Sequence, residues 1–317
     1  MKWYSFSGRE DCHAEGEVIE DRILYSLIVS LRLGEARDVV LGLGNVTRYG
    51  RKDSAFLPVA GAPPRYQFYK NTLRIDYPAG SPSDNRIFFN LKGHGVGNVE
   101  DHDLAVYAGR FLWPEDASGA PGAESSREQG SEGKRWIPED AGEAPWAVTS
   151  REQGSGEERR IPEGLQAVSV EGTPLDFRQI TPIEERIRVG YEPLVRRHGY
   201  DHLYLLDDGE EGAGEAALCH AATLRDHART LRMEVYTSFP ALYVYTGNRF
   251  SGKDIGKGGC IYPVRGGIML APVEVSPEGS AGSMEGGRIP RPSQRGGIVE
   301  YRFYPMEQDF SKDVKGR

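Results

Sequence analysis

The chain has 317 residues, of which 39 are Lys or Arg and 47 are Asp or Glu, and its formal net charge is -8. This acidic balance argues against nucleic acid as a partner, because a nucleic-acid-binding surface needs a basic patch or stripe. No segment approaches the roughly 18 consecutive apolar residues of a membrane span, and the N-terminal residues lack the apolar core of a signal peptide. The sequence therefore predicts a cytoplasmic protein that does not enter a membrane.

The first predicted elements are short strands. Runs rich in β-branched and aromatic residues occur at 23–29 and 104–107, and Gly, Pro, Asp or Asn residues bound them. Such runs are typical of strands separated by turns.

Residues 114–163 form a segment of different composition. The sequence S-R-E-Q-G-S at 126–131 returns 24 residues later at 150–155, within a stretch rich in Gly, Ser and Glu. Such a composition cannot bury enough apolar surface to offset chain entropy, so it predicts a disordered low-complexity loop. A surface loop tolerates this growth, because the entropy of loop closure rises slowly with length.

The second half of the chain continues the strand pattern. A weak helical stripe lies near residues 183–194, and strand-like runs follow at 203–206, 231–236, 242–245 and 299–304. Many short strands with turn signals and no strand–helix–strand rhythm predict an all-β sandwich or barrel.

The sequence predicts neither a metal site nor a disulfide framework. The three cysteines, Cys12, Cys219 and Cys260, are odd in number and far apart. His198 and His202 are four residues apart, a spacing that binds metal on a helix, but the intervening Gly199 breaks a helix. We therefore expect no metal and no other cofactor.

Seven segments, taken in chain order, carry a family resemblance. They are Asp38-Val39-Val40-Leu41-Gly42, Asn85-Arg86-Ile87-Phe88-Phe89-Asn90-Leu91, Asp101-His102-Asp103-Leu104, Gly172-Thr173-Pro174-Leu175-Asp176-Phe177-Arg178, Gly199-Tyr200-Asp201-His202, Tyr245-Thr246-Gly247-Asn248 and Gly259-Cys260-Ile261-Tyr262-Pro263. Each motif alone is weak, but their shared order over residues 38 to about 304 resembles the aldose 1-epimerase (galactose mutarotase) family.

The resemblance implies a fold and a reaction. The fold is a large antiparallel β-sandwich (a galactose mutarotase-like supersandwich), here a single domain over residues 1–317 that the insertion at about 114–163 interrupts. The family reaction interconverts the α and β anomers of aldoses, with a glutamate as general base and a histidine as general acid. It uses no cofactor, and we expect a monomer whose partner is a small-molecule sugar.

The two catalytic positions of the family are both replaced. Arg86 stands at the position of the acid histidine, and Ala271 stands at the position of the base glutamate. An arginine side chain keeps its proton, with a pKa above about 12, so it is no general acid at neutral pH. Glu274, three residues beyond Ala271, is an alternative base if its loop is rearranged. A family block that carries a second histidine is also absent between Lys70 and Leu73.

The resemblance leaves four candidate substrate-binding residues, Asp201, Arg65, Arg86 and Tyr243. Each has a plainer reading as well. Asp201 is also a common turn residue, and Arg65 is also an ordinary solvated charge. Tyr243 is either an aromatic platform for a sugar ring or a residue on the packed face of a strand. Arg86 either binds an acidic ligand or pairs with Asp201.

Three functions remain open at this point. The first is an aldose 1-epimerase family protein with weak or lost activity. The second is a non-catalytic carbohydrate-binding protein, and the third is an incomplete gene product from which the block after Lys70 was lost.

Overall fold

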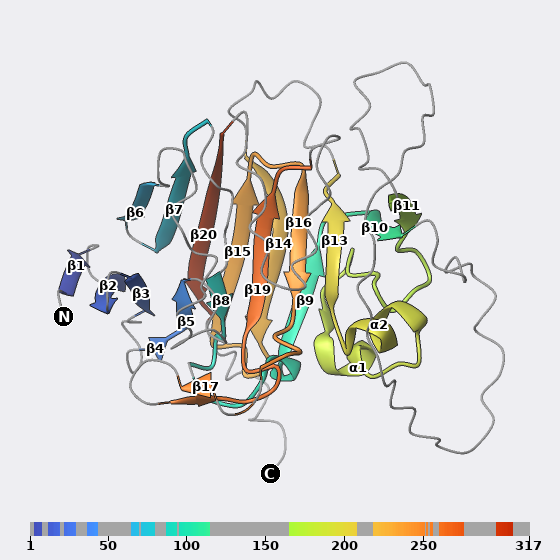
Figure 1. Cartoon of the computed structure of the whole chain (residues 1–317), viewed down its shortest axis with the longest axis horizontal. Helices are drawn as coiled ribbons and strands as arrows, with labels where there is room; N and C mark the ends of the chain where they lie inside the picture. The colour runs from blue at the N-terminus through green and yellow to red at the C-terminus, as the bar shows by residue number, and fades with distance from the viewer. Residues whose placement is uncertain are drawn as a thin grey trace, which may run out of the picture.

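The computed structural model describes residues 3–7, 12–19, 22–29, 37–43, 65–69, 71–79, 87–93, 95–114, 165–207, 218–250, 252, 254–255, 260–275 and 296–306. Within these ranges the chain is built almost entirely of strands in four sheets (Figure 1). All the strand pairs found there are antiparallel. The predicted all-β, antiparallel fold class is therefore confirmed.

Two seven-stranded sheets form the body of the molecule. The first, called the front sheet, has the order β11-β10-β13-β16-β19-β8-β5, and the second, the back sheet, has the order β12-β9-β14-β15-β20-β7-β6. The strands of the front sheet are β5 (Val40–Leu43), β8 (Ile87–Phe89), β10 (Arg110–Pro114), β11 (Leu165–Ser169), β13 (Asp201–Leu205), β16 (Ala241–Tyr245) and β19 (Ile268–Val273). The strands of the back sheet are β6 (Arg65–Tyr69), β7 (Thr72–Tyr77), β9 (His102–Val106), β12 (Thr181–Pro182), β14 (Cys219–Asp226), β15 (Leu231–Thr237) and β20 (Gly297–Pro305).

Smaller elements complete the described chain. A four-stranded sheet contains β1 (Trp3–Ser7), β2 (Cys12–Ile19), β3 (Arg22–Val29) and β4 (Arg37–Asp38), and a two-stranded sheet contains β17 (Asp254–Ile255) and β18 (Ile261–Tyr262). The helices are the short 3-10 helix η2 (Val99–Asp101) and the α-helices α1 (Ile183–Ile187) and α2 (Glu192–Arg197). None of the helices in the described residues is long and apolar enough to span a membrane.

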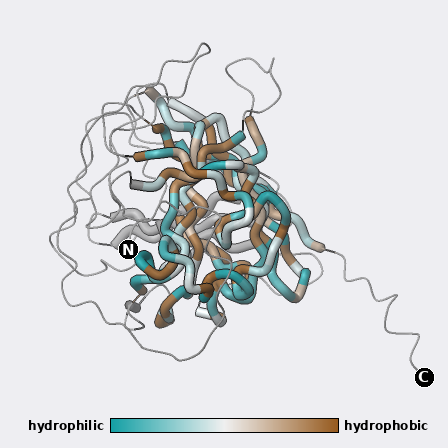
Figure 2. The backbone as a smooth tube through the Cα atoms, turned by 90° about the vertical axis from the view of Figure 1, so that its right-hand side faces the viewer, coloured by the Kyte–Doolittle hydropathy of each residue, from teal (hydrophilic) through white to brown (hydrophobic). Residues whose placement is uncertain are grey.

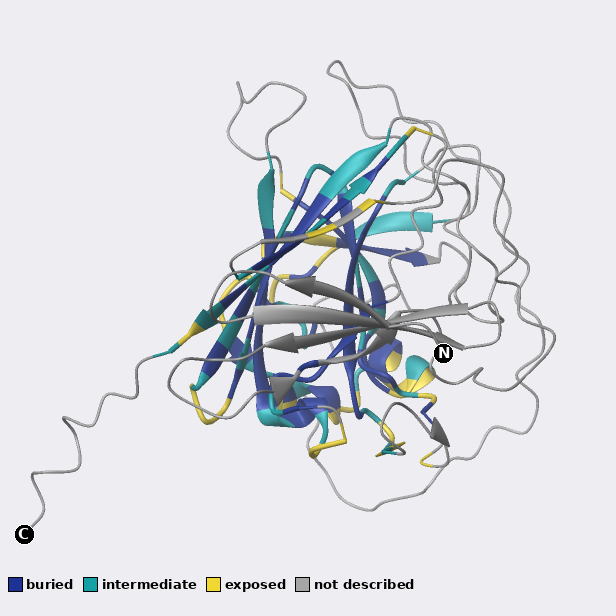
Figure 3. Cartoon of the chain, turned by 90° about the vertical axis from the view of Figure 1, so that its left-hand side faces the viewer, coloured by how far each residue is buried: buried dark blue, intermediate teal, exposed yellow. Residues whose placement is uncertain are grey.

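Alternating side chains create the core between the two large sheets. Along β15, Leu231, Met233 and Val235 are buried and their neighbours are only partly covered, as expected for a strand with one face toward a core. Hydrophobic and hydrophilic residues alternate along the tube in Figure 2, and Figure 3 shows the buried residues in the middle of the strands. A hydrogen bond crosses the core, from the Tyr301 hydroxyl to the Leu270 carbonyl at 2.9 Å.

The predicted strand runs all overlap observed strands, and the weak helical stripe near 183–194 becomes α1 and α2. The predicted disordered loop lies outside the described residues. Its two ends are neighbours, since Pro114 of β10 pairs with Leu165 of β11.

The chain junction after Lys70 is a hairpin. β6 and β7 pair antiparallel with Tyr69 opposite Thr72, and Asn71 lies in the turn before β7. Asn71 in this turn is fixed to β20, because its side-chain amide donates to the Phe303 carbonyl at 2.7 Å. The two strands that flank the position of the absent family block are therefore joined directly.

Candidate functional site

The outer faces of the two large sheets differ in chemistry. On the back sheet, the Glu300 carboxylate forms ion pairs with Arg74 at 3.0 Å and Arg302 at 2.7 Å, so this face is charged and internally paired. On the front sheet, the face away from the core carries an aromatic cluster. Its members are Phe88, Tyr243, Tyr245, Phe250, Tyr262, Met269 and Ala271. Five of these residues are buried, and Tyr243 and Tyr245 are the partly exposed members of the cluster.

The rings of the aromatic cluster pack closely. The centroids of Phe88 and Phe250 lie 5.0 Å apart, and Tyr243 and Tyr245 stack at 6.3 Å with an interplanar angle of 23°. Tyr243 and Tyr245 are two residues apart on β16, so they project from the same face of the strand. The cluster therefore offers ring surface together with phenolic hydroxyl groups.

Asp201 supplies a carboxylate beside this cluster. It is the first residue of β13, which pairs with β16, and the Tyr243 hydroxyl donates a hydrogen bond to Asp201 Oδ1. Burial, and then the neighbouring Asp201 charge, raise the pKa of Tyr243 well above its usual value of 10. At neutral pH the phenol therefore remains protonated and acts as a donor, not as a base.

Ala271 lies directly across from Tyr243. The register of β16 and β19 pairs these two residues, and Ala271 is fully buried in the aromatic cluster. Its methyl group has no proton to give or take. Glu274 is the residue that follows the end of β19. It lies three positions after Ala271, which corresponds to about 10 Å along an extended chain. The described part of the site thus presents a donor–acceptor pair beside an apolar position.

A side-chain clamp fixes the turn that leads into Asp201. The Asn248 side-chain nitrogen donates to the Arg197 carbonyl at 3.2 Å and to the Tyr200 carbonyl at 2.9 Å. The Thr246 hydroxyl donates to Asn248 Oδ1 at 2.7 Å. Gly199 makes this arrangement possible, because a Cβ there would overlap Asn248 Oδ1.

His202 holds the next backbone group. Its Nδ1 accepts a hydrogen bond from the Asp201 amide at 3.0 Å, and its ring stacks on Trp113 with centroids 6.0 Å apart. Complete burial lowers the pKa of His202 to about 3, so the ring is neutral and its Nδ1 carries no proton. Asp201 is therefore bounded by the clamp on one side and by His202 on the other.

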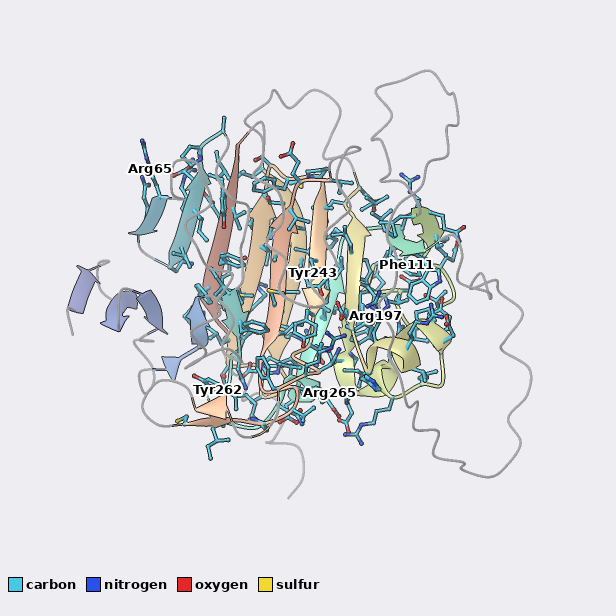
Figure 4. The ribbon with its side chains drawn as sticks, viewed as in Figure 1. Arg65, Phe111, Arg197, Tyr243, Tyr262 and Arg265 are labelled. Carbon is cyan, nitrogen blue, oxygen red and sulfur yellow. The ribbon has the colours of Figure 1, made fainter. Side chains whose placement is uncertain are left out.

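Two arginines lie at this turn, and both are labelled in Figure 4. Arg197 ends α2, and its positive charge opposes the rise in the pKa of Tyr243. Arg265 donates to the His198 carbonyl at 2.8 Å and forms an ion pair with the buried Glu100 at 2.6 Å. The ends of α2, η2 and the loop before β19 are thereby tied together.

The predicted site residues do not all meet. Asp201 and Tyr243 are in direct contact, and Ala271 is next to Tyr243. Arg65 is exposed on β6, the edge strand of the back sheet, and Figure 4 shows it well away from Tyr243. The structure therefore does not bring Arg65 to this site. Arg86 lies outside the described residues.

The histidines and cysteines considered as metal ligands lie in separate parts of the fold. His198 is the left-handed C-cap of α2 and His202 is in β13, so they belong to different elements. Cys219 and Cys260 form no disulfide, and the Cys219 thiol donates to the Thr237 carbonyl at 3.1 Å. In the ranges that the structure describes, no group of three or more His, Cys, Asp or Glu side chains is placed to hold a metal ion.

Sequence reasoning missed Asn248, Arg197 and Arg265. The available signal for Asn248 was its place in the Y-T-G-N segment, which matches the family, while its partner Gly199 lies in the matching G-Y-D-H segment. Nothing in the sequence indicated that the two motifs contact each other. Arg197 and Arg265 gave no signal at all.

Comparisons with known proteins agree with the motifs. A model of the aldose 1-epimerase family matches residues 145–272. The mouse galactose mutarotase is 29% identical over 186 residues, which cover 59% of this chain and 39% of that protein. The aldose 1-epimerase of Escherichia coli K12 is 27% identical over 178 residues, which cover 56% of this chain and 37% of that protein. The chain thus spans only about two fifths of the length of these relatives.

Two solved structures have low similarity to the chain. An aldose epimerase homologue from C. elegans has a TM-score of 0.44 and 13% identity, covering 97% of this chain and 70% of that one. Galactose 1-epimerase from Lactobacillus acidophilus has a TM-score of 0.46 and 15% identity, covering 92% and 97%. By the family model and the curated relatives, the predicted resemblance to the aldose 1-epimerase family is confirmed.

Proposed function

We propose that this chain, which resembles the aldose 1-epimerase family over residues 145–272, binds an aldose on the front sheet and interconverts its anomers weakly or not at all. One observation carries the proposal. Ala271, at the family's base position, lies opposite Tyr243, whose hydroxyl is bound to Asp201. In this proposal the Asp201–Tyr243 pair binds the sugar, and Ala271 supplies no group that could accept a proton.

The binding argument rests on complementary chemistry. A pyranose has hydroxyl groups around its rim and C–H groups on its faces. The Asp201 carboxylate accepts hydrogen bonds from hydroxyls, and bonds to a charged group contribute about 1.5–3 kcal/mol each. The rings of Tyr243 and Tyr245 supply apolar surface for the C–H face.

The catalytic argument rests on what the described residues lack. Anomer interconversion needs one group to take the proton of the anomeric hydroxyl and another to protonate the ring oxygen, each worth about 10²–10⁴ in rate. Ala271 offers no such group, and the buried Tyr243 phenol holds its proton. A guanidinium at Arg86 would hold its proton as well.

The test combines a binding and a rate measurement on the full chain. Calorimetric titration with galactose and glucose should show binding, while polarimetry should show mutarotation close to the uncatalysed rate. Asp201→Asn should weaken binding by at least about tenfold, as expected for a lost bond worth about 1.4 kcal/mol.

A matched control is available on the back sheet. There the Tyr236 hydroxyl donates to the Glu234 carboxylate at 3.0 Å, so Glu234→Gln removes an equivalent tyrosine–carboxylate pair away from the proposed site. Turnover in the ordinary enzymatic range of about 1–10³ per second would contradict the loss of catalysis. Equal effects of the two substitutions on binding would contradict the role of Asp201.

A further inference from the structure

Asn248 makes three hydrogen bonds around the turn between α2 and β13. Its side-chain nitrogen donates to the carbonyls of Arg197 and Tyr200, at 3.2 and 2.9 Å. Its side-chain oxygen accepts from the Thr246 hydroxyl at 2.7 Å. The two carbonyls lie on either side of His198 and Gly199, so the amide spans the whole turn.

Only a carboxamide fits this set of partners. Both backbone carbonyls are acceptors, so the Asn248 nitrogen must face them and its oxygen faces the Thr246 hydroxyl, which fixes the orientation of the side chain. An aspartate of the same shape has no N–H to donate, so both carbonyls lose this hydrogen bond, while the Tyr200 carbonyl keeps the one from the Thr246 amide at 3.1 Å. The arrangement is therefore specific for asparagine at this position.

The turn itself is unusual enough to need such support. His198 has φ 58° and Gly199 has φ 141°, both in the left-handed region that favours glycine. A Cβ at Gly199 would overlap the Asn248 side chain. The residue two positions after Gly199 is Asp201, whose carboxylate receives the Tyr243 hydroxyl. The direction in which the chain leaves the turn thus decides where this carboxylate lies.

We infer that Asn248 is a positioning residue of the proposed sugar site: its carboxamide locks the α2–β13 turn and so places the Asp201 carboxylate against Tyr243. The inference rests on the proposed function for its consequence in sugar binding. The placement of Asp201 can be measured without any sugar.

The chain contains a matched control. Asn90 is fully buried, and its side-chain nitrogen also donates to two carbonyls, those of Val96 and Gly266, both at 3.1 Å. Asn248→Asp and Asn90→Asp therefore make the same chemical change in two amide clamps. Only the first clamp bonds directly to the carbonyls that flank the turn before Asp201, whereas Asn90 reaches it only through the loop that carries Arg265.

The experiment reads out Asp201 directly. The side-chain carboxyl carbon resonance of Asp201 is assigned in the ¹³C NMR spectrum of the full chain by its loss in Asp201→Asn. Asn248→Asp should move this resonance and weaken galactose binding by roughly tenfold, which corresponds to about 1.4 kcal/mol. Asn90→Asp should leave both unchanged even if it lowers the melting temperature. If Asn248→Asp does not fold, Thr246→Val, which removes the hydroxyl bound to Asn248, should shift the same resonance.

Each outcome separates the two ideas. An Asp201 resonance unchanged by the Asn248 or Thr246 substitution overturns the positioning role. Equal shifts from Asn248→Asp and Asn90→Asp overturn it too, because they indicate a general loosening. A resonance shifted by Asn248→Asp, in a protein whose wild type binds neither galactose nor glucose, supports the positioning role and removes the proposed sugar function.

Discussion

Lowering the pH should test the burial of His202. The perturbation is a change from pH 7 to pH 5, compared between the wild type and His202→Gln, whose amide oxygen can still accept from the Asp201 amide but does not titrate. Burial lowers the pKa of His202 from 6.5 to about 3. Below pH 6.5 the unfolded chain therefore binds a proton that the folded chain does not bind.

The sign and size follow from this difference. Above pH 6.5 His202 is neutral in both states and does not reduce the unfolding free energy. As the pH falls from 6.5 toward 3, proton uptake by the unfolded chain lowers the unfolding free energy by about 1.4 kcal/mol per pH unit. Between pH 7 and pH 5 the loss is about 2 kcal/mol. His102, whose pKa burial lowers to about 4, should contribute a similar loss of about 2 kcal/mol over the same interval.

The assay is chemical denaturation at each pH. The wild type should lose about 4 kcal/mol of unfolding free energy from these two histidines, and His202→Gln should lose about half of that. A difference between wild type and variant that stays constant from pH 7 to pH 5 would refute the reasoning. It would mean that His202 takes up its proton equally in the folded and unfolded chains.

Three further substitutions probe the frame of the site. Gly199→Ala should lower the unfolding free energy by about 2 kcal/mol or more, because the new Cβ meets Asn248 and the backbone has φ 141°; thermal melting unchanged from wild type would count against this clash. Tyr301→Phe should cost about 1 kcal/mol through the lost hydrogen bond to the Leu270 carbonyl, measured by urea denaturation, and a neutral result would show that this bond between the sheets is replaceable. Glu100→Gln should cost about 1–3 kcal/mol, since it leaves two arginines without their carboxylate, and a smaller effect at high salt than at low salt would argue against a buried pair.

The strands were predictable because their signal is local. Alternation along 231–236 and 299–304 requires only that one face of each strand be buried, and both runs lie in observed strands, β15 and β20. The order of the strands in the two sheets was not available from such patterns, because it depends on contacts between distant segments.

The site was predictable only in part for the same reason. Asp201 and Tyr243 were both candidates, but the clamp between Gly199 and Asn248 joins residues 49 positions apart in the sequence through a side chain. Arg65 was a candidate from its place in the resemblance. Its strand pairs with β7 at the edge of the back sheet, and no local pattern told which sheet this strand would join.

The edges of the two large sheets have a consequence for how the protein behaves at high concentration. The edge strands β12, β6, β11 and β5 have 2, 5, 5 and 4 residues, while the interior strand β20 has 9. An edge strand exposes unpaired backbone groups to which a strand of another molecule can add, and short edges offer few of them. At β12 the proline Pro182 also lacks the amide hydrogen that a ladder requires. We therefore expect β12 to be the edge least able to recruit a second chain into an aggregate.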